Sequence, residues 1–225
     1  MNRPENNDPV SGGKLAQGAD KESSECFAAP LGSITGGRME FGRGAANVTI
    51  RADSATEALY RARFEGPEPR VQSEDGTVTI RYPRTFHLFE ARRRCAEVTL
   101  NARIPWEVEI RDGASRLTAD LRGLELRSFE VSGGASRLEL TLPPPAGTVP
   151  VRILGGASNV AIHRLEAAAA RVRVGGGSTN LALDDQRFGA VGGELSLRGP
   201  DYERASDRYD ITITGGASGL IIDAG

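Results

Sequence analysis

The sequence predicts an all-β fold, a single-stranded β-solenoid with coils of about 21 residues and an N-terminal cap of strands and a hairpin. Two observations predict it. A short glycine-rich motif recurs at a nearly constant spacing, and apolar residues alternate with polar ones on both sides of each copy. Constant spacing of this length is typical of repeat architectures, and alternation with a period of two is typical of strands that bury one face.

The repeated motif reads Gly-Gly-Ala-Ser-x-Leu or a close variant of it. The five regular copies begin at Asp112, Gly133, Gly155, Gly176 and Gly215, and an outlying copy begins at residue 43. The steps between the regular copies are 21, 22, 21 and 39 residues, the last of which is close to two periods. We therefore expect one coil per period, with a degenerate coil over residues 191–197 and an excursion loop over residues 200–208.

The residues around each copy predict two strands per coil. The positions four and two residues before each copy are apolar, and so are the last motif residue and the position two residues after it. Before the motif these residues are Val108, Ile110, Phe129, Val131, Val151, Ile153, Val172, Val174, Ile211 and Ile213. From the end of the motif onward they are Leu117, Ala119, Leu138, Leu140, Val160, Ile162, Leu181, Leu183, Leu220 and Ile222. We expect all of them to face the core.

The motif itself is predicted to form the corner between the two strands of a coil. Glycine permits a crowded backbone there, and the small residues after it stack on their equivalents in the next coil. The predicted corner residues are Gly113, Ala114, Ser115, Gly134, Ala135, Ser136, Gly156, Ala157, Ser158, Gly177, Gly216, Ala217 and Ser218.

The chain divides into a tail and one folded domain. Residues 1–26 carry hardly any large apolar side chain, so they cannot bury enough surface to offset the entropy of ordering, and we predict a disordered tail. Residues 27–225 are predicted to form the solenoid domain, with the cap and first strands over 27–105 and the regular coils over 106–225. Within the cap, Asp75-Gly76 predicts a tight hairpin turn.

Composition excludes several classes of protein. The 28 basic residues are balanced by 30 acidic ones, so the basic surplus of a general nucleic-acid binder is missing. No apolar run is long enough to span a membrane and no secretory signal is found, from which we expect a cytoplasmic location. Cys26 and Cys95 lack the spacing of metal ligands. They are either two free thiols or one long-range disulfide.

Stacked coils would arrange outward side chains in ladders. The first ladder is Glu40, Glu109, Glu130, Arg152, Arg173 and Thr212. We expect a solvated face in which Glu130 lies beside Arg152, Glu109 beside Glu130 and Arg152 beside Arg173. The second is Asp120, Thr141, His163, Asp184 and Asp223, where a histidine beside a carboxylate is either a polar surface contact, which we expect, or a metal or acid-base site. The glycine turns lack the P-loop lysine and the dinucleotide fingerprint. No catalytic residue, metal site or cofactor is predicted.

The segment 84–94 is the strongest candidate for partner contact, because aromatic and arginine side chains are favoured at interface hot spots and at anionic membrane surfaces. The candidate residues are Phe86, His87, Phe89, Arg92, Arg93 and Arg94. In the other interpretation, Phe86 and Phe89 fold back and cover the first coils.

On these residues the chain resembles a bacterial family of putative-adhesin, or toast-rack, β-solenoid domains, related to the C-terminal domain of LiaF-like envelope-stress regulators. The resemblance rests on the motif copies at 113, 134, 156 and 216, on Glu74-Asp75-Gly76-Thr77-Val78-Thr79-Ile80, and on Arg187-Phe188-Gly189-Ala190-Val191-Gly192-Gly193. It covers roughly residues 32–225. LiaF-like regulators also have N-terminal membrane helices, and no such helix is found in this sequence.

The resemblance implies a non-enzymatic interaction or scaffold module, with envelope stress or signalling as its setting. We expect another protein as the partner, and peripheral membrane contact and homo-oligomers stay open. One alternative is a carbohydrate-binding or carbohydrate-active β-helix, which a groove lined by Asp184, Asp185, Arg187 and His163 would favour. Another is a structural protein that self-associates through exposed sheet edges.

Overall fold

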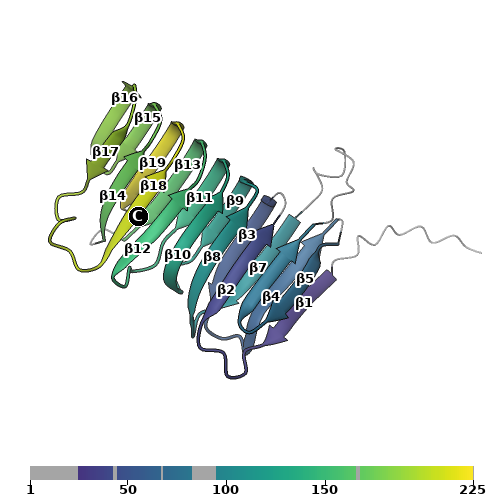
Figure 1. Cartoon of the computed structure of the whole chain (residues 1–225). Helices are drawn as coiled ribbons and strands as arrows, with labels where there is room; N and C mark the ends of the chain where they lie inside the picture. Colours follow the sequence, from purple (N-terminus) through teal and green to yellow (C-terminus); the bar gives the residue numbers. More distant parts are fainter. Residues whose placement is uncertain (1–24, 43–44, 67, 83–94, 166–167, 225) are drawn as a thin grey trace, which may run out of the picture.

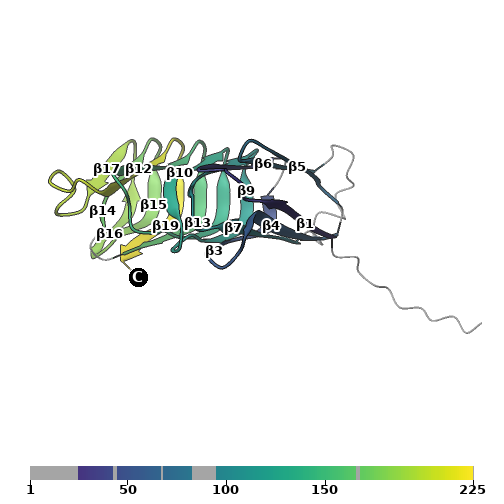
Figure 2. The ribbon, with the colours of Figure 1, turned by 90° about the horizontal axis from the view of Figure 1, so that it is seen from below.

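The computed structural model describes residues 25–42, 45–66, 68–82, 95–165 and 168–224, and these residues form strands and no helix. The strands make two mixed sheets that face each other as two layers (Figures 1 and 2). The all-β prediction is confirmed. No helical segment in the described part of the chain could cross a lipid bilayer.

Sheet A has ten strands and sheet B has nine. In spatial order, sheet A contains β1 (Glu25–Pro30), β4 (Ala58–Glu65), β7 (Cys95–Asn101), β3 (Ala45–Asp53), β9 (Ala114–Asp120), β11 (Ala135–Thr141), β13 (Ala157–Arg164), β19 (Ala217–Ala224), β15 (Ser178–Leu183) and β16 (Gln186–Val191). Sheet B contains β17 (Leu195–Arg198), β14 (Ala169–Val174), β18 (Arg208–Ile213), β12 (Thr148–Ile153), β10 (Glu125–Ser132), β8 (Pro105–Arg111), β2 (Gly37–Gly42), β6 (Thr77–Arg81) and β5 (Arg70–Glu74).

Each glycine motif connects a strand of sheet B to a strand of sheet A, and we call such a pair of strands a coil. The coils are β2–β3, β8–β9, β10–β11, β12–β13, β14–β15 and β18–β19. Neighbouring coils pair in parallel and in register, so that Phe129 lies opposite Val151 in sheet B and Ala135 opposite Ala157 in sheet A. Equivalent motif residues therefore lie side by side.

The coils do not stack in the order of the sequence, which corrects the predicted single-stranded solenoid. Strands β18 and β19 lie between β12–β13 and β14–β15 in their sheets. The double-length step before them holds no degenerate coil, because β16 pairs antiparallel with β15 and β17 pairs antiparallel with β14. Asp184 has a φ of 50° at the turn after β15, and there the chain reverses within sheet A instead of crossing to sheet B.

The core lies between the two sheets, as the alternation predicts. All twenty apolar positions predicted to face inward are buried, with exposed fractions of 2% or less. Trp106 fills the core near β2, and its Nε1 donates a hydrogen bond to the carbonyl oxygen of Asn101 at 2.8 Å. Side chains of neighbouring coils stack on one another, which extends a single apolar core along both sheets.

One position of the motif has a left-handed backbone in every coil, and the sequence pattern did not reveal it. It is the fifth residue of the motif, where φ lies between 53° and 64° in Asn47, Arg116, Arg137, Asn159, Asn180 and Gly219. The strand pairing skips this residue, passing from Ser136 opposite Ser158 directly to Leu138 opposite Val160. Asparagine and glycine tolerate this conformation, whereas most other residues lose about 1–2 kcal/mol in it.

Both cysteines are exposed free thiols. Strand β4 lies between β1, which carries Cys26, and β7, which carries Cys95. Two strand spacings separate their backbones by about 9.6 Å or more, and a disulfide needs Cα atoms within about 7 Å. The disulfide alternative is therefore not formed. Strand β1 begins at Glu25, and the preceding residues of the predicted tail lie outside the described residues.

Candidate functional site

The predicted partner-binding segment, residues 84–94, lies outside the part of the chain that the structure describes. Its candidate residues, Phe86, His87, Phe89, Arg92, Arg93 and Arg94, lie outside the described residues.

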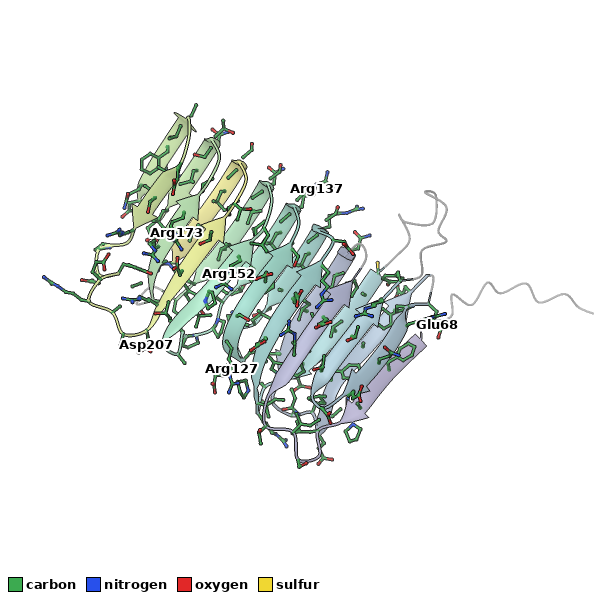
Figure 3. The ribbon with its side chains drawn as sticks, viewed as in Figure 1. Glu68, Arg127, Arg137, Arg152, Arg173 and Asp207 are labelled. Atoms are coloured by element: carbon green, nitrogen blue, oxygen red, sulfur yellow. The ribbon has the colours of Figure 1, made fainter. Side chains whose placement is uncertain are left out.

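The first predicted ladder crosses the outer face of sheet B, but two of its members exchange places. The order is Glu40, Glu109, Glu130, Arg152, Thr212 and Arg173, because β18 lies between β12 and β14. The prediction that Arg152 lies beside Arg173 is wrong, and Figure 3 labels these two arginines on their separate strands. The predicted pair of Glu130 and Arg152 is present, with Arg152 Nη1 3.7 Å from Glu130 Oε2.

Ion pairs cover the N-terminal half of this face. Arg38 contacts Glu40, Glu107 and Glu109 at 3.1, 3.2 and 2.7 Å, and Arg111 contacts Glu109 at 2.8 Å. Partial burial would raise the pKa of Glu109, but hydrogen bonds from Arg111 and Arg38 outweigh it and lower that pKa below its ordinary value. Since each carboxylate already has a cation beside it, this half of the face has little uncompensated charge to offer a ligand.

The second ladder lies on the outer face of sheet A and brings His163 beside Asp223. The imidazole Nδ1 lies 2.6 Å from Asp223 Oδ1 across the β13–β19 pair. The sequence pattern placed Asp184 next to His163, which is wrong, because β19 separates β13 from β15. Within the described ranges, no group of three histidine, cysteine, aspartate or glutamate side chains is arranged to hold a metal ion.

A cavity of about 460 Å³ lies at the corner opposite the glycine motifs, where β13, β15 and β19 end. Its polar lining is Arg164, Asp184, Asp185, Asp201 and Asp223. Arg164, whose side chain is only 4% exposed, donates from Nη2 to Asp184 Oδ2. His163 and Arg187 are not part of this lining, so this cavity is not the four-residue groove that would have favoured a carbohydrate-active protein.

A second cavity, of about 390 Å³, lies on the outer face of sheet A, close to its end at β16. It is lined by Asn180, Leu181, Ala182, Arg187, Phe188, Gly189, Gly219 and Ile221. We call it the Ile221 depression, because Ile221 is 46% exposed and is one of the largest apolar side chains on the described surface.

The Ile221 depression ends a row of outward residues that becomes apolar along the sheet. The row runs through Thr118, Glu139, Ala161, Ile221 and Ala182 on five adjacent strands. Arg187 of β16 lies next in the row, opposite Ala182. The candidate residues of the sequence did not include Ile221. The available signal was the run Leu220-Ile221-Ile222, in which a large apolar residue occupies the outward position that holds threonine, glutamate or alanine in the other coils.

Strand β16 forms the edge of sheet A beside this depression. Four of its six residues are exposed, and it pairs with β15 on one side only. An edge strand presents unpaired main-chain N–H and C=O groups to any extended segment that reaches it. The depression and the edge therefore make one continuous surface with both apolar and main-chain contacts to offer.

Comparisons with known proteins point to one family. A family model described as the N-terminal domain of toast_rack, DUF2154, matches residues 21–163. Among solved structures, a putative cell adhesion protein from Clostridium sporogenes ATCC 15579 superposes with a TM-score of 0.67 at 18% identity, covering 90% of this chain and 99% of that chain.

A putative adhesin from Bacteroides fragilis NCTC 9343 gives a TM-score of 0.39 at 11% identity, covering 91% of this chain and 98% of that chain. No curated protein matches the chain. The likeness to the clostridial structure is one of fold, and a shared fold does not transfer a function.

Proposed function

This chain belongs to the toast-rack family, and we propose that it is a non-enzymatic module that binds another protein. The observation that carries the proposal is the Ile221 depression, an apolar hollow on an exposed sheet face that adjoins the open edge of β16. The clostridial protein of similar fold is described as a putative cell adhesion protein, and this description supports the same class of function.

The chemistry of the depression suits a protein ligand. Burying the exposed part of Ile221 would contribute favourably to binding, at about 25 cal/mol per Å² of apolar area removed from water. Arg187 at the rim supplies a planar cation, and arginine is enriched among the residues that dominate interface energies. An extended segment of the partner can add to β16 through main-chain hydrogen bonds while its side chains enter the hollow.

The outer face of sheet B suits a partner less well. Its carboxylates and guanidinium groups pair with one another over the N-terminal half, so a ligand there must break ion pairs to make new ones. An exposed ion pair contributes about 0–1 kcal/mol, which leaves little free energy to gain by exchanging it. We therefore place the binding surface on sheet A.

The proposal is tested by affinity capture with matched charge substitutions. Ile221→Glu puts a carboxylate in the depression, and Thr118→Glu puts the same group at the equivalent outward position on β9, three strands away from β19. Both positions are exposed, so both variants should stay folded, and the new carboxylate opposite Glu139 should cost Thr118→Glu at most about 1 kcal/mol. Each chain serves as bait in an extract of the source cells, and captured proteins are quantified by mass spectrometry.

We expect Thr118→Glu to recover the wild-type partners and Ile221→Glu to lose them. Equal recovery by both variants would place the partner elsewhere and overturn the proposed surface. An envelope-stress or signalling setting is part of the proposal, and the identity of the captured proteins would test it. The cytoplasmic location expected from the sequence stays a prediction, which fractionation of the source cells would test.

A further inference from the structure

The last coil, β18–β19 over residues 208–224, is inserted between two coils that precede it in the chain. In Figure 1 its two yellow strands lie among green ones, with β12 and β13 on one side and β14 and β15 on the other. All four of these pairings are parallel. The two flanking coils therefore form a slot that is one coil wide.

Both walls of the slot pair with the last coil in the same register. Ile211 lies opposite Val151 on one side and opposite Val172 on the other. Ala217 lies likewise between Ala157 and Ser178. An in-register fit on both sides requires a segment with the length and apolar pattern of a motif coil.

Polar contacts make the slot specific for this particular coil. Asp210 of β18 contacts Arg171 and Arg173 of β14, and the Nη2 of Arg173 lies 3.4 Å from Asp210 Oδ2. On the other wall, Asp223 of β19 contacts His163 of β13. The charges of the occupant thus match partners that both flanking coils supply.

Buried side chains anchor the coil in the slot. Tyr209, Ile211, Ile213, Leu220 and Ile222 are fully buried. The Tyr209 hydroxyl donates a hydrogen bond to the carbonyl oxygen of Pro143 at 2.6 Å, and burial raises the pKa of that hydroxyl above its ordinary value. Residues 208–224 are therefore held between the flanking coils by buried apolar side chains and by the hydrogen bond to Pro143.

The linker over residues 199–207 carries the chain from β17 past β14 to β18. Strands β17 and β18 are two strand spacings apart, about 10 Å, whereas a nine-residue segment can span about 30 Å. Tyr202 holds the linker down between the guanidinium groups of Arg171 and Arg208, which lie 5.0 and 4.9 Å from its ring. The linker has the spare length to extend away from the sheet if these contacts open.

We propose that the slot also accepts the last coil of a second copy of this chain, so that two copies exchange residues 208–224 reciprocally. Every contact of the docked coil is restored in the exchanged dimer, because the same residues meet in the same register. Exchange of an identical element is a low-cost route to a dimer, and the linker serves as the hinge. The proposal is independent of the Ile221 depression, and failure of either leaves the other standing.

Cysteine cross-linking between differently marked chains tests the exchange. One chain carries Arg152→Cys on the slot wall, and the other carries Thr212→Cys on the coil, since these residues are paired across β12 and β18. Both chains also carry Cys26→Ser and Cys95→Ser. The two chains are mixed, unfolded, refolded together and oxidised, and the products are separated on a non-reducing gel.

Two controls define the signal. A single chain with both cysteines, refolded and oxidised at a concentration too low for exchange, should form an internal disulfide and run as a monomer, which shows that the pair can be bridged. Replacing Arg152→Cys by Glu130→Cys moves the thiol one strand further from β18, to β10, and should abolish the cross-link.

We expect a covalent dimer of the two marked chains. While the monomer predominates, the dimer-to-monomer ratio should rise about tenfold for each tenfold increase in chain concentration, because the coil of a second copy competes with the chain's own coil, whose effective concentration the linker sets. Deleting residues 201–206 leaves three linker residues to pass around β14 and should raise the ratio further. The deletion variant is a supplementary experiment, and the proposal is tested by the chain that keeps its full linker. If that mixture forms no dimer at its highest soluble concentration while the double-cysteine chain cross-links internally, the exchange does not occur.

Discussion

The corner glycines are predicted to be essential for the close approach of neighbouring coils, and Gly155→Ala tests this. A Cβ at position 155 would lie 2.7 Å from the carbonyl carbon and oxygen of Gly133 and 2.8 Å from the nitrogen of Gly134. All three are backbone atoms of the adjacent coil, so one coil must shift. Overpacking of this kind costs about 1–3 kcal/mol. For a domain of this size, the melting temperature should fall by about 2–12 °C, at about 2–4 °C for each kcal/mol.

Gly192→Ala is the matched control, because a Cβ there meets no atom within 4 Å. Neither glycine has a positive φ, so the comparison isolates the steric term. Replacing glycine by alanine at an unstrained site stabilises a protein by about 0.4–1 kcal/mol through the unfolded chain, so this variant should melt at or slightly above the wild-type temperature. Thermal unfolding followed by circular dichroism measures both variants. Equal melting temperatures would refute the claim that the coils contact each other at these corners.

Three further outcomes follow from the same structure. Arg137→Asn should stabilise the chain by up to about 1 kcal/mol in urea unfolding, because asparagine tolerates the left-handed backbone at this position; a loss of stability would contradict that reason. Tyr209→Phe should destabilise it by about 1–3 kcal/mol, since the buried carbonyl of Pro143 loses its donor, and an unchanged urea midpoint would argue against that bond. The folded-state pKa of Glu109 is lowered, so its contribution to stability is present above the unfolded pKa of about 4.3 and is lost as the pH falls through the folded value. Melting temperatures between neutral and acidic pH should therefore fall less steeply in Glu109→Gln, and identical slopes would count against this linkage.

The outward ladders show how far sequence reasoning reaches. The alternation predicted that Glu130 and Arg152 lie on the same outer face, at equivalent positions of neighbouring strands, and they form an ion pair there. It assigned His163 to the correct row but placed Asp184 beside it, whereas Asp223 is the neighbour. Asp184 was misplaced because the wrong coils were taken to be adjacent. The alternation within a strand predicts which face of the sheet each residue occupies, but it does not predict which strand lies beside it.

The candidate binding surface was missed for a related reason. Ile221 stands out in the sequence only as a break in alternation. The Ile221 depression forms because β19, β15 and β16 lie side by side, which the sequence did not show. Residues 186–191 contribute to it because β15 and β16 form a hairpin. The turn at Asp184 decides that pairing, and in the sequence the same stretch was compatible with one more coil.

The sequence by itself determined the coil as the building unit, its two strands, the corner at Gly155-Gly156-Ala157-Ser158 and the core face of the strands in the regular coils. These are local properties, set by alternation and by the space that small residues leave for a neighbouring backbone. Only the tertiary structure decided the order of the coils and the insertion of β18–β19. Because all coils carry the same motif and the same apolar positions, each can pair in register with any other. Contacts specific to one neighbour, such as Asp210 with Arg171 and Tyr209 with Pro143, distinguish the observed order from the sequential one.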